Sequence, residues 1–287
     1  MVLVEKGHGQ RILESYHTIK RKRAVTTEDF IIELFCWVDD QMGMKPKHSQ
    51  ASLYPSELVT IGLLFALKGG YFCAFYRWLR RDYADLFAGL PERTRLQRLL
   101  VTHQDWCAAF LAKPTFFTVI DSYGIELIHP IREGRSAQQI GKKGKSNWRW
   151  IVGMKLCWLL NDAGRVVHWA WNTANVADKV FLPLVVAHED ETIVLADTGF
   201  KDRAGIPTNL KLCARGTWNE RMLVETALSL VTMVCHLKKV FHRTCAHFEA
   251  RLAYVAAMFN ALLALNRTRQ PDADPQDRLL HLAQYAL

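Results

Sequence analysis

The chain lacks the short motifs that mark several large enzyme classes. No G-x-x-x-x-G-K-[ST] sequence is present, so the backbone loop that holds ATP phosphates in P-loop enzymes is missing. No G-x-S-x-G sequence is present either, and a Ser-His-Asp hydrolase of the α/β type needs that turn to expose its nucleophile. The sequence therefore does not indicate ATP-driven chemistry or serine hydrolysis.

Signals for export and for membrane insertion are also missing. The N-terminus has no apolar signal-peptide core, and Lys68 and Gly69-Gly70 interrupt the best apolar run, so no membrane span is predicted. Seven cysteines, an odd number with no C-x-x-C pair, are typical of reduced thiols. We expect a soluble, cytoplasmic protein.

Acidic residues are scarce relative to basic ones. The chain has 28 Asp and Glu against 37 Lys and Arg, which gives a net charge of +9 and a pI near 9.2. Such a balance favours a polyanionic partner, with nucleic acid first and an anionic membrane second. Half of the 287 residues are apolar and 23% are charged, which is a globular profile for one large domain or two ordinary ones.

Residues 1–112 have mainly helical periodicity. One helix is expected over 56–67 and a second over 71–82, with Gly69-Gly70 as the break between them. Pro91 suits the first position of a third helix.

The third expected helix carries three arginines, Arg93, Arg95 and Arg98. A helix, a glycine-containing turn and a basic helix are compatible with a helix-turn-helix DNA reader. They are equally compatible with an ordinary helical bundle that has a solvated basic face. The sequence leaves both interpretations open.

The pattern changes to strands after Pro114. A helical segment near 178–187 precedes the fourth strand, and a helix with Glu225 follows the fifth; the strands are expected at 115–121, 150–160, 165–173, 192–197 and 209–214. This order resembles a ribonuclease-H-like α/β fold, in which the first and fourth strands are parallel neighbours. We expect that catalytic core over 113–240, an N-terminal helical, DNA-end-binding domain over 1–112, and a C-terminal helical segment over 241–287.

Two of these strands end in an aspartate, Asp121 and Asp197. Strand packing does not call for a carboxylate there, and a carboxylate held at such a place usually faces a cation. With Glu225 they would make a site for two Mg²⁺ or Mn²⁺ ions. Asp121 would bridge both ions, Asp197 would bind one, and Glu225 the other.

The helix of Glu225 is expected to be amphipathic. Val224, Leu228, Val231 and Cys235 form an apolar stripe, and a polar stripe lies beside it: Arg221, Glu225, Ser229, Thr232, His236 and Lys239. Glu225 would lie on the open face, with Arg221 one turn away and able to pair with it or with a phosphate. Glu220 is the rival acid but falls off this stripe. An ordinary solvated Arg–Glu pair is the alternative.

A basic stretch separates the first two strands. Glu133 is its one acidic residue, and Gly141, Gly144 and Ser146 are expected to keep it mobile; its basic residues are Arg132, Arg135, Lys142, Lys143, Lys145 and Arg149. Basic residues beside Trp148 and Trp150 suit phosphate contacts and base stacking. A solvated loop with its tryptophans packed under the sheet is the alternative.

The order of several segments resembles bacterial insertion-sequence DDE transposases. The segments are Val119-Ile-Asp-Ser-Tyr, Trp150-Ile-Val-Gly-Met-Lys-Leu, Thr173-Ala-Asn-Val-Ala-Asp178, Val194-Leu-Ala-Asp-Thr-Gly-Phe200 and Asn219-Glu-Arg-Met-Leu-Val-Glu225. Each is weak alone, and their order and spacing carry the resemblance over about residues 30–265. Thr198-Gly-Phe200 departs from the family's commoner Lys-Gly-Tyr, and no clear Tyr precedes Arg221.

The resemblance implies a function as well as a fold. Asp121, Asp197 and Glu225 would be the catalytic triad, and Arg221, Lys238 and Lys239 would be basic residues of the same helix that contact DNA. The family acts on double-stranded element ends and target DNA with magnesium, and two ends processed together imply a homodimer on DNA. The alternatives are a ribonuclease-H-fold DNA nuclease that never joins strands and a non-catalytic DNA-binding relative. A zinc site among Cys235, His236, His242, Cys245 and His247 has no standard spacing.

Overall fold

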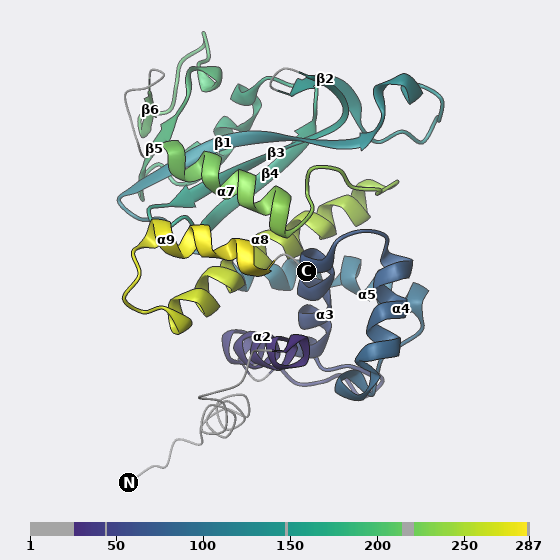
Figure 1. The fold of residues 1–287 in the computed structure, drawn as a ribbon. Helices are drawn as coiled ribbons and strands as arrows, with labels where there is room; N and C mark the ends of the chain where they lie inside the picture. The colour runs from purple at the N-terminus through teal and green to yellow at the C-terminus, as the bar shows by residue number, and fades with distance from the viewer. Residues whose placement is uncertain (1–25, 44, 147–148, 214–220, 286–287) are drawn as a thin grey trace.

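The computed structural model describes residues 26–43, 45–146, 149–213 and 221–285, and it shows a mixed α/β protein built on one mixed sheet (Figure 1). The sheet lies on one side of the molecule and the N-terminal helices on the other, with the C-terminal helices between and beside them.

The N-terminal part is helical, as predicted. It consists of α2 (Thr27–Met42), α3 (Pro55–Lys68), α4 (Phe72–Asp82), the 3₁₀ turn η1 (Ala84–Phe87), α5 (Arg93–Thr102) and η2 (Gln104–Phe110). Thr26 and Asp29 form a capping box that fixes the start of α2. Gly69 and Gly70, both with positive φ, end α3 where predicted, and α3 and α4 meet at 118°.

The third helix begins later than the sequence suggested. Pro91 was expected as its first residue, but α5 begins at Arg93, because the Glu92 carboxylate accepts the Thr94 and Arg95 amides and caps the helix. Residues 83–92, which include η1, separate α4 from α5. This connection is longer than the short turn of a helix-turn-helix motif, so α4 and α5 do not form that motif.

The sheet contains six strands: β1 (Phe117–Ile128), β2 (Lys142–Ser146), β3 (Arg149–Asn161), β4 (Val166–Thr173), β5 (Ile193–Ala196) and β6 (Leu210–Leu212). Their order is β2-β3-β1-β5-β6, and β4 pairs with the other half of β3 from the same edge as β2. β1 is antiparallel to β3 and parallel to β5, and β5 is parallel to β6. Between β4 and β5 lie η4 (Asp178–Phe181) and α6 (Leu182–Val186).

Two hydrophobic cores cover the two faces of the sheet. The smaller core packs Ile120 and Val194 against η4, α6 and η5 (Thr198–Phe200). The larger core packs Val119 and Leu195 against α7 (Arg221–Val234) and α8 (Cys245–Arg269). The chain ends with α9 (Pro275–Leu280) and η6 (His281–Tyr285). The larger core takes residues from all three segments of the predicted domain division.

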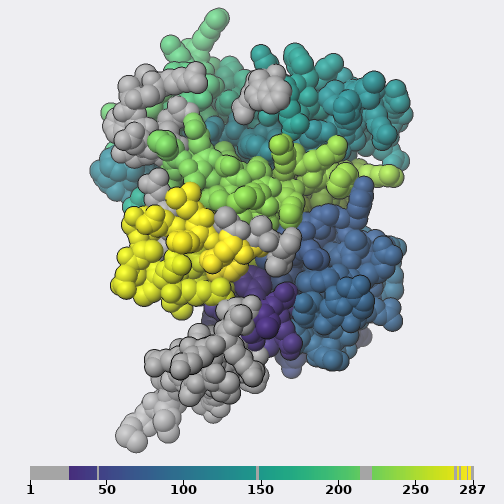
Figure 2. Space-filling model, viewed as in Figure 1, coloured from purple at the N-terminus to yellow at the C-terminus, as the bar shows by residue number. Residues whose placement is uncertain are grey.

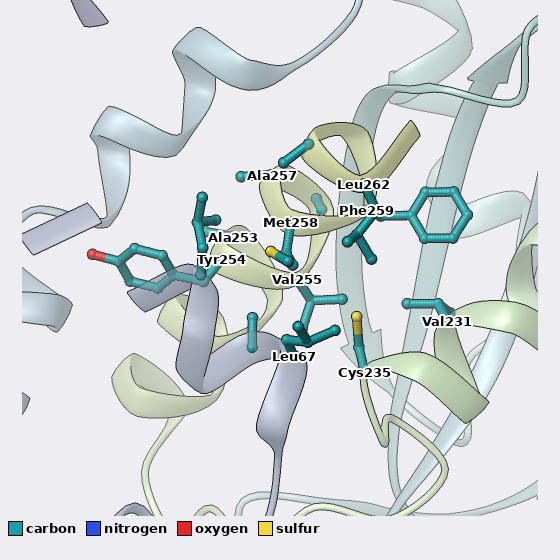
Figure 3. Close-up of a cluster of buried hydrophobic side chains, with 14 of the residues drawn as sticks. Leu67, Val231, Cys235, Ala253, Tyr254, Val255, Ala257, Met258, Phe259 and Leu262 are labelled. Atoms are coloured by element: carbon teal, nitrogen blue, oxygen red, sulfur yellow. The ribbon is translucent and has the colours of Figure 1, made fainter. Parts of the chain in front are cut away.

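Helix α8 is the centre of the larger core, and Figure 3 shows its side chains facing α3 and α7. Asn260 ties it to the rest: its amide donates to Phe110 O and Val166 O, and its carbonyl accepts from Val166 N. The sequence predicted no apolar run of membrane-spanning length, but by length and composition alone α8 reaches it. However, 89% of that stretch is buried inside the protein, as in the core helix of a soluble protein.

Candidate catalytic site beside strand β5

The parallel pairing of β1 and β5 places two aspartates side by side. Thr118 pairs with Val194 and Val119 with Leu195, so the same register, continued by two positions, sets Asp121 level with Asp197. Asp197 lies just beyond β5. Asp121 was expected at a strand end and instead lies inside β1, because that strand continues along β3 to Ile128. Both side chains are half-buried.

Local hydrogen bonds orient both carboxylates. The Asp197 side chain caps η5 by accepting the Gly199 amide at 2.8 Å, and Asp121 Oδ1 accepts the Ser122 amide at 2.7 Å. Val119 packs in the larger core and Ile120 in the smaller one, so strand alternation puts Asp121 on the face that α7 covers.

A third aspartate, Asp178 of η4, lies near Asp197 on the smaller-core face of the sheet, opposite to the face of Asp121, and the sequence did not predict this neighbour. Ser122 Oγ donates to Asp178 Oδ1 at 2.5 Å, and Lys155 Nζ lies 2.9 Å from the same oxygen. A Cβ built on Gly199 would lie 2.9 Å from Asp197 Oδ1 and 3.0 Å from Asp178 Oδ2. Only glycine fits between these carboxylates without displacing one of them.

The charges of Asp121, Asp178 and Lys155 also shift the pKa of the buried Cys157 thiol. Burial raises this pKa well above the ordinary value, and the negative charges of Asp121 and Asp178 raise it further. Lys155 opposes the effect and is the cation of the cluster. Its ammonium also donates to Val176 O at 2.9 Å, which ties β3 to the segment before η4. The two carboxylates in register are thus flanked, on the smaller-core face of the sheet, by an aspartate that a lysine and a hydroxyl bind.

Glu225 lies on α7, which packs against β1 on the Asp121 face. The apolar stripe of this helix is confirmed, since Val224, Leu228, Val231 and Cys235 are all buried, and Glu225 itself is exposed. The rival acid Glu220 and the Arg221 side chain lie outside the described residues. No three Asp, Glu, His or Cys side chains within the described ranges are grouped closely enough to hold a metal ion. Carboxylates are donors that magnesium prefers, and the β1–β5 register sets two of the three predicted ligands level with each other.

The basic stretch before β3 is not the loop that was predicted. Residues 142–146 form strand β2, in which Lys142, Lys143 and Lys145 are exposed. Gly144 is required by close packing and not by mobility, since a Cβ there would lie 1.9 Å from Ala174 O. Lys143 lies 3.6 Å from Glu133 and 5.8 Å from the Trp150 ring centroid.

The remaining predicted DNA contacts divide into exposed and paired residues. Arg132, in the turn η3 (Pro130–Arg132), and Arg135 are exposed, as are the three arginines of α5. Arg149 and Lys239, however, both pair with the buried Glu126, at 3.4 and 3.1 Å. Such paired cations are held by the protein itself, which favours a structural role for both.

The helix of Glu225 is shorter than predicted. It ends at Val234, and His236 has a positive φ of 53°, so the chain turns away before Lys238 and Lys239. That segment instead pairs with β1, where Glu126 N donates to Lys238 O and Val240 N donates to Glu126 O. The two lysines therefore lie beside the sheet and not on the α7 face.

Trp150 and Trp148 have different outcomes. Trp150 is 59% exposed beside the lysines of β2, so it does not pack under the sheet, whereas Trp148 lies outside the described residues.

Comparison of the chain with protein-family models and with curated proteins finds no match in either set.

Proposed function

We propose that this chain is a metal-dependent DNA transposase with a ribonuclease-H-like catalytic core. The observation that carries the proposal is the β1–β5 register, which sets Asp121 level with Asp197 at one edge of a central parallel pair. The strand order supports the same fold, because the antiparallel strands β1, β3 and β4 are followed, after η4 and α6, by β5 and β6, which are parallel to β1. The DDE resemblance of the sequence supplies the family.

The proposed metal ligands are Asp121, Asp197 and Glu225. Bound Mg²⁺ or Mn²⁺ would supply Lewis-acid charge neutralisation and an activated oxygen nucleophile for phosphodiester cleavage. Carboxylates suit this task, and Asp121 shares the face of the sheet on which α7 carries Glu225. Only these three residues are assigned to the metal, since Asp178 is bound by Lys155 and Ser122.

The residues around the carboxylates have other tasks in this proposal. Lys155 and Asp178 fix η4 against β3 and so hold the position of Gly199, beside Asp197. The exposed lysines of β2, with Arg132 and Arg135, attract the DNA backbone beside the site. We further propose a homodimer that pairs two element ends and works in the cytoplasm on the chromosome.

The test is cleavage and strand joining on the DNA that flanks this reading frame, with Asp121→Asn against the matched variant Asp162→Asn. Asp162 is exposed in the β3–β4 turn of the same sheet, so it makes an equal change of charge away from the site. Asp121→Asn should abolish cleavage and keep or increase DNA affinity, because the carboxylate repels phosphate. Normal cleavage by Asp121→Asn would refute the assignment.

Strand joining separates the two enzymatic alternatives. Cleaved ends that become joined to a second duplex identify a transposase, whereas cleavage without joining identifies a nuclease with the same site. Terminal inverted repeats in the flanking DNA would support the first. DNA binding without cleavage by the unmodified chain in magnesium or manganese would leave the non-catalytic relative.

A further inference from the structure

A cavity of about 600 Å³ lies away from the carboxylates, where the N-terminal helices meet the start of α8. The ends of α3, α4 and α5 form one wall, and residues 241–254 form the other. The segment between α7 and α8 passes along this boundary, between the sheet and the N-terminal helices (Figures 1 and 2). The volume is within the range of small-molecule sites and suits a mononucleotide.

The charges that line this cavity have one sign. Arg93, Arg243 and Arg251 line it, together with His242 and His247, and none of its described lining residues is Asp or Glu. The N-terminus of the 25-residue helix α8 lies at the same wall and adds its own partial positive charge. The cavity is therefore built for an anion.

Arg251 gives the strongest evidence, because its charge is buried without a counter-ion. It is 3% exposed, and its guanidinium donates to two backbone carbonyls, Phe65 O and Cys235 O. No ion pair joins it to a carboxylate in the described part of the chain, and burial lowers its pKa to about 10. Burying a cation without a compensating anion lowers the free energy of unfolding, so an anion bound here would stabilise the fold.

His242 supplies a second buried group that lacks a partner. Its Nδ1 atom is buried with no hydrogen-bond partner. Burial, then the charges of Arg251 and His247, lower the His242 pKa to about 3, so the ring is neutral and either nitrogen can carry the proton. A phosphate oxygen in the cavity would accept from it.

Two aromatic side chains complete the lining. Tyr71 and Phe241 stack on each other with ring centroids 4.5 Å apart, and they are 61% and 46% exposed. Exposed aromatic faces next to cationic groups are the combination with which proteins hold a nucleobase and its phosphate. An inorganic anion would leave these faces unused.

We propose that this cavity binds a nucleotide, with its phosphate against Arg243 and Arg251 and its base against the Tyr71–Phe241 pair. The nucleotide has two possible sources, a free mononucleotide or one unit of a bound DNA strand. Only the second source rests on the proposed function. The cavity needs neither metal nor the carboxylate site to bind its ligand.

The experiment titrates the full-length chain, without divalent metal, with inorganic phosphate, with dAMP and with a single-stranded oligonucleotide. Calorimetry gives each affinity. Arg251→Gln risks unfolding, so the test variant is Arg243→Gln, which is exposed at the cavity wall. Loss of one charge-assisted contact should weaken nucleotide binding about tenfold. The control is Arg77→Gln, an equal loss of charge at an exposed position of α4 that does not line the cavity.

A second variant tests the base. Phe241→Leu should weaken dAMP binding and leave phosphate binding unchanged. If dAMP binds and its binding is weakened by Arg243→Gln and Phe241→Leu but not by Arg77→Gln, the ligand is a free nucleotide. If only the oligonucleotide binds, with the same effects of the three variants, the ligand is one unit of a DNA strand. Equal losses in Arg243→Gln and Arg77→Gln, or no binding of either ligand, would overturn the proposal. DNA cleavage is measured separately, so failure of one proposal leaves the other standing.

Discussion

Replacing Lys155 with methionine tests whether the Lys155–Asp178 pair holds the carboxylate site together. The two side chains are only 15% and 25% exposed, and the ammonium makes two contacts of 2.9 Å, to Asp178 Oδ1 and Val176 O. Methionine keeps most of the length of the lysine side chain and removes its charge. It leaves a half-buried carboxylate with its Ser122 contact alone, and a carbonyl without its donor.

Hydrogen bonds to charged groups contribute about 1.5–3 kcal/mol, and loss of one partner from a buried pair costs more. Because this pair is partly solvated, we expect Lys155→Met to reduce the free energy of unfolding by about 2 kcal/mol. In a chain of this size that is a fall in Tm of roughly 4 °C.

The adjacent pair Lys179–Asp202 is the control for this experiment. Its N···O distance is similar, 3.1 Å, but Lys179 is 46% exposed, so Lys179→Met should reduce the free energy of unfolding by less than Lys155→Met does. Urea denaturation followed by circular dichroism measures both variants. Equal stability losses in the two variants would show that the Lys155 contacts do not support the site.

Three further predictions concern the DNA, the metal and acid. Neutralising Lys142, Lys143 and Lys145 together should weaken binding to all DNA sequences alike and reduce the slope of log K against log salt by about 0.9 per lost phosphate contact; altered base preference at an unchanged slope would mean that β2 reads sequence. Magnesium or manganese should support cleavage and raise Tm slightly, calcium should hold DNA but cut poorly, and undiminished cleavage in excess chelator would exclude the metal mechanism. Burial depresses the pKa of His242 to about 3 in the folded protein, so as the pH falls below about 6.5 the unfolded protein binds a proton on this histidine before the folded protein does. The free energy of unfolding should therefore decline from there towards pH 3 by up to about 1.4 kcal/mol per pH unit. His242→Gln should flatten this decline, and an unchanged acid titration would contradict the prediction.

The strands around Asp121 and Asp197 could be predicted because each is a short apolar run that packs on both faces of the sheet. All five expected strands and the helix of Glu225 are present. That the strands of Asp121 and Asp197 pair in parallel could be predicted only from the fold that the order of elements resembles.

Other features depended on contacts between distant segments. The sequence of β2 predicts a solvated loop, because apolar residues do not alternate with its lysines. Only its pairing with β3 makes it a strand. The end of α7 is set by pairing of residues 238–240 with Glu126. Asp178 was visible in the motif Thr173–Asp178, but nothing local signals that Lys155 and Ser122 lie within reach.

The central position of α8 has a consequence for how the chain acquires its fold during synthesis. This helix leaves the ribosome after α3, η2 and β4, yet all three bury their apolar surfaces against it. The N-terminal helices and the sheet must therefore wait, with those surfaces exposed, until about residue 269 has emerged. A nascent chain that stops short of α8 would present unprotected helix and strand faces to chaperones and proteases. Prematurely terminated copies should accordingly be degraded and not accumulate.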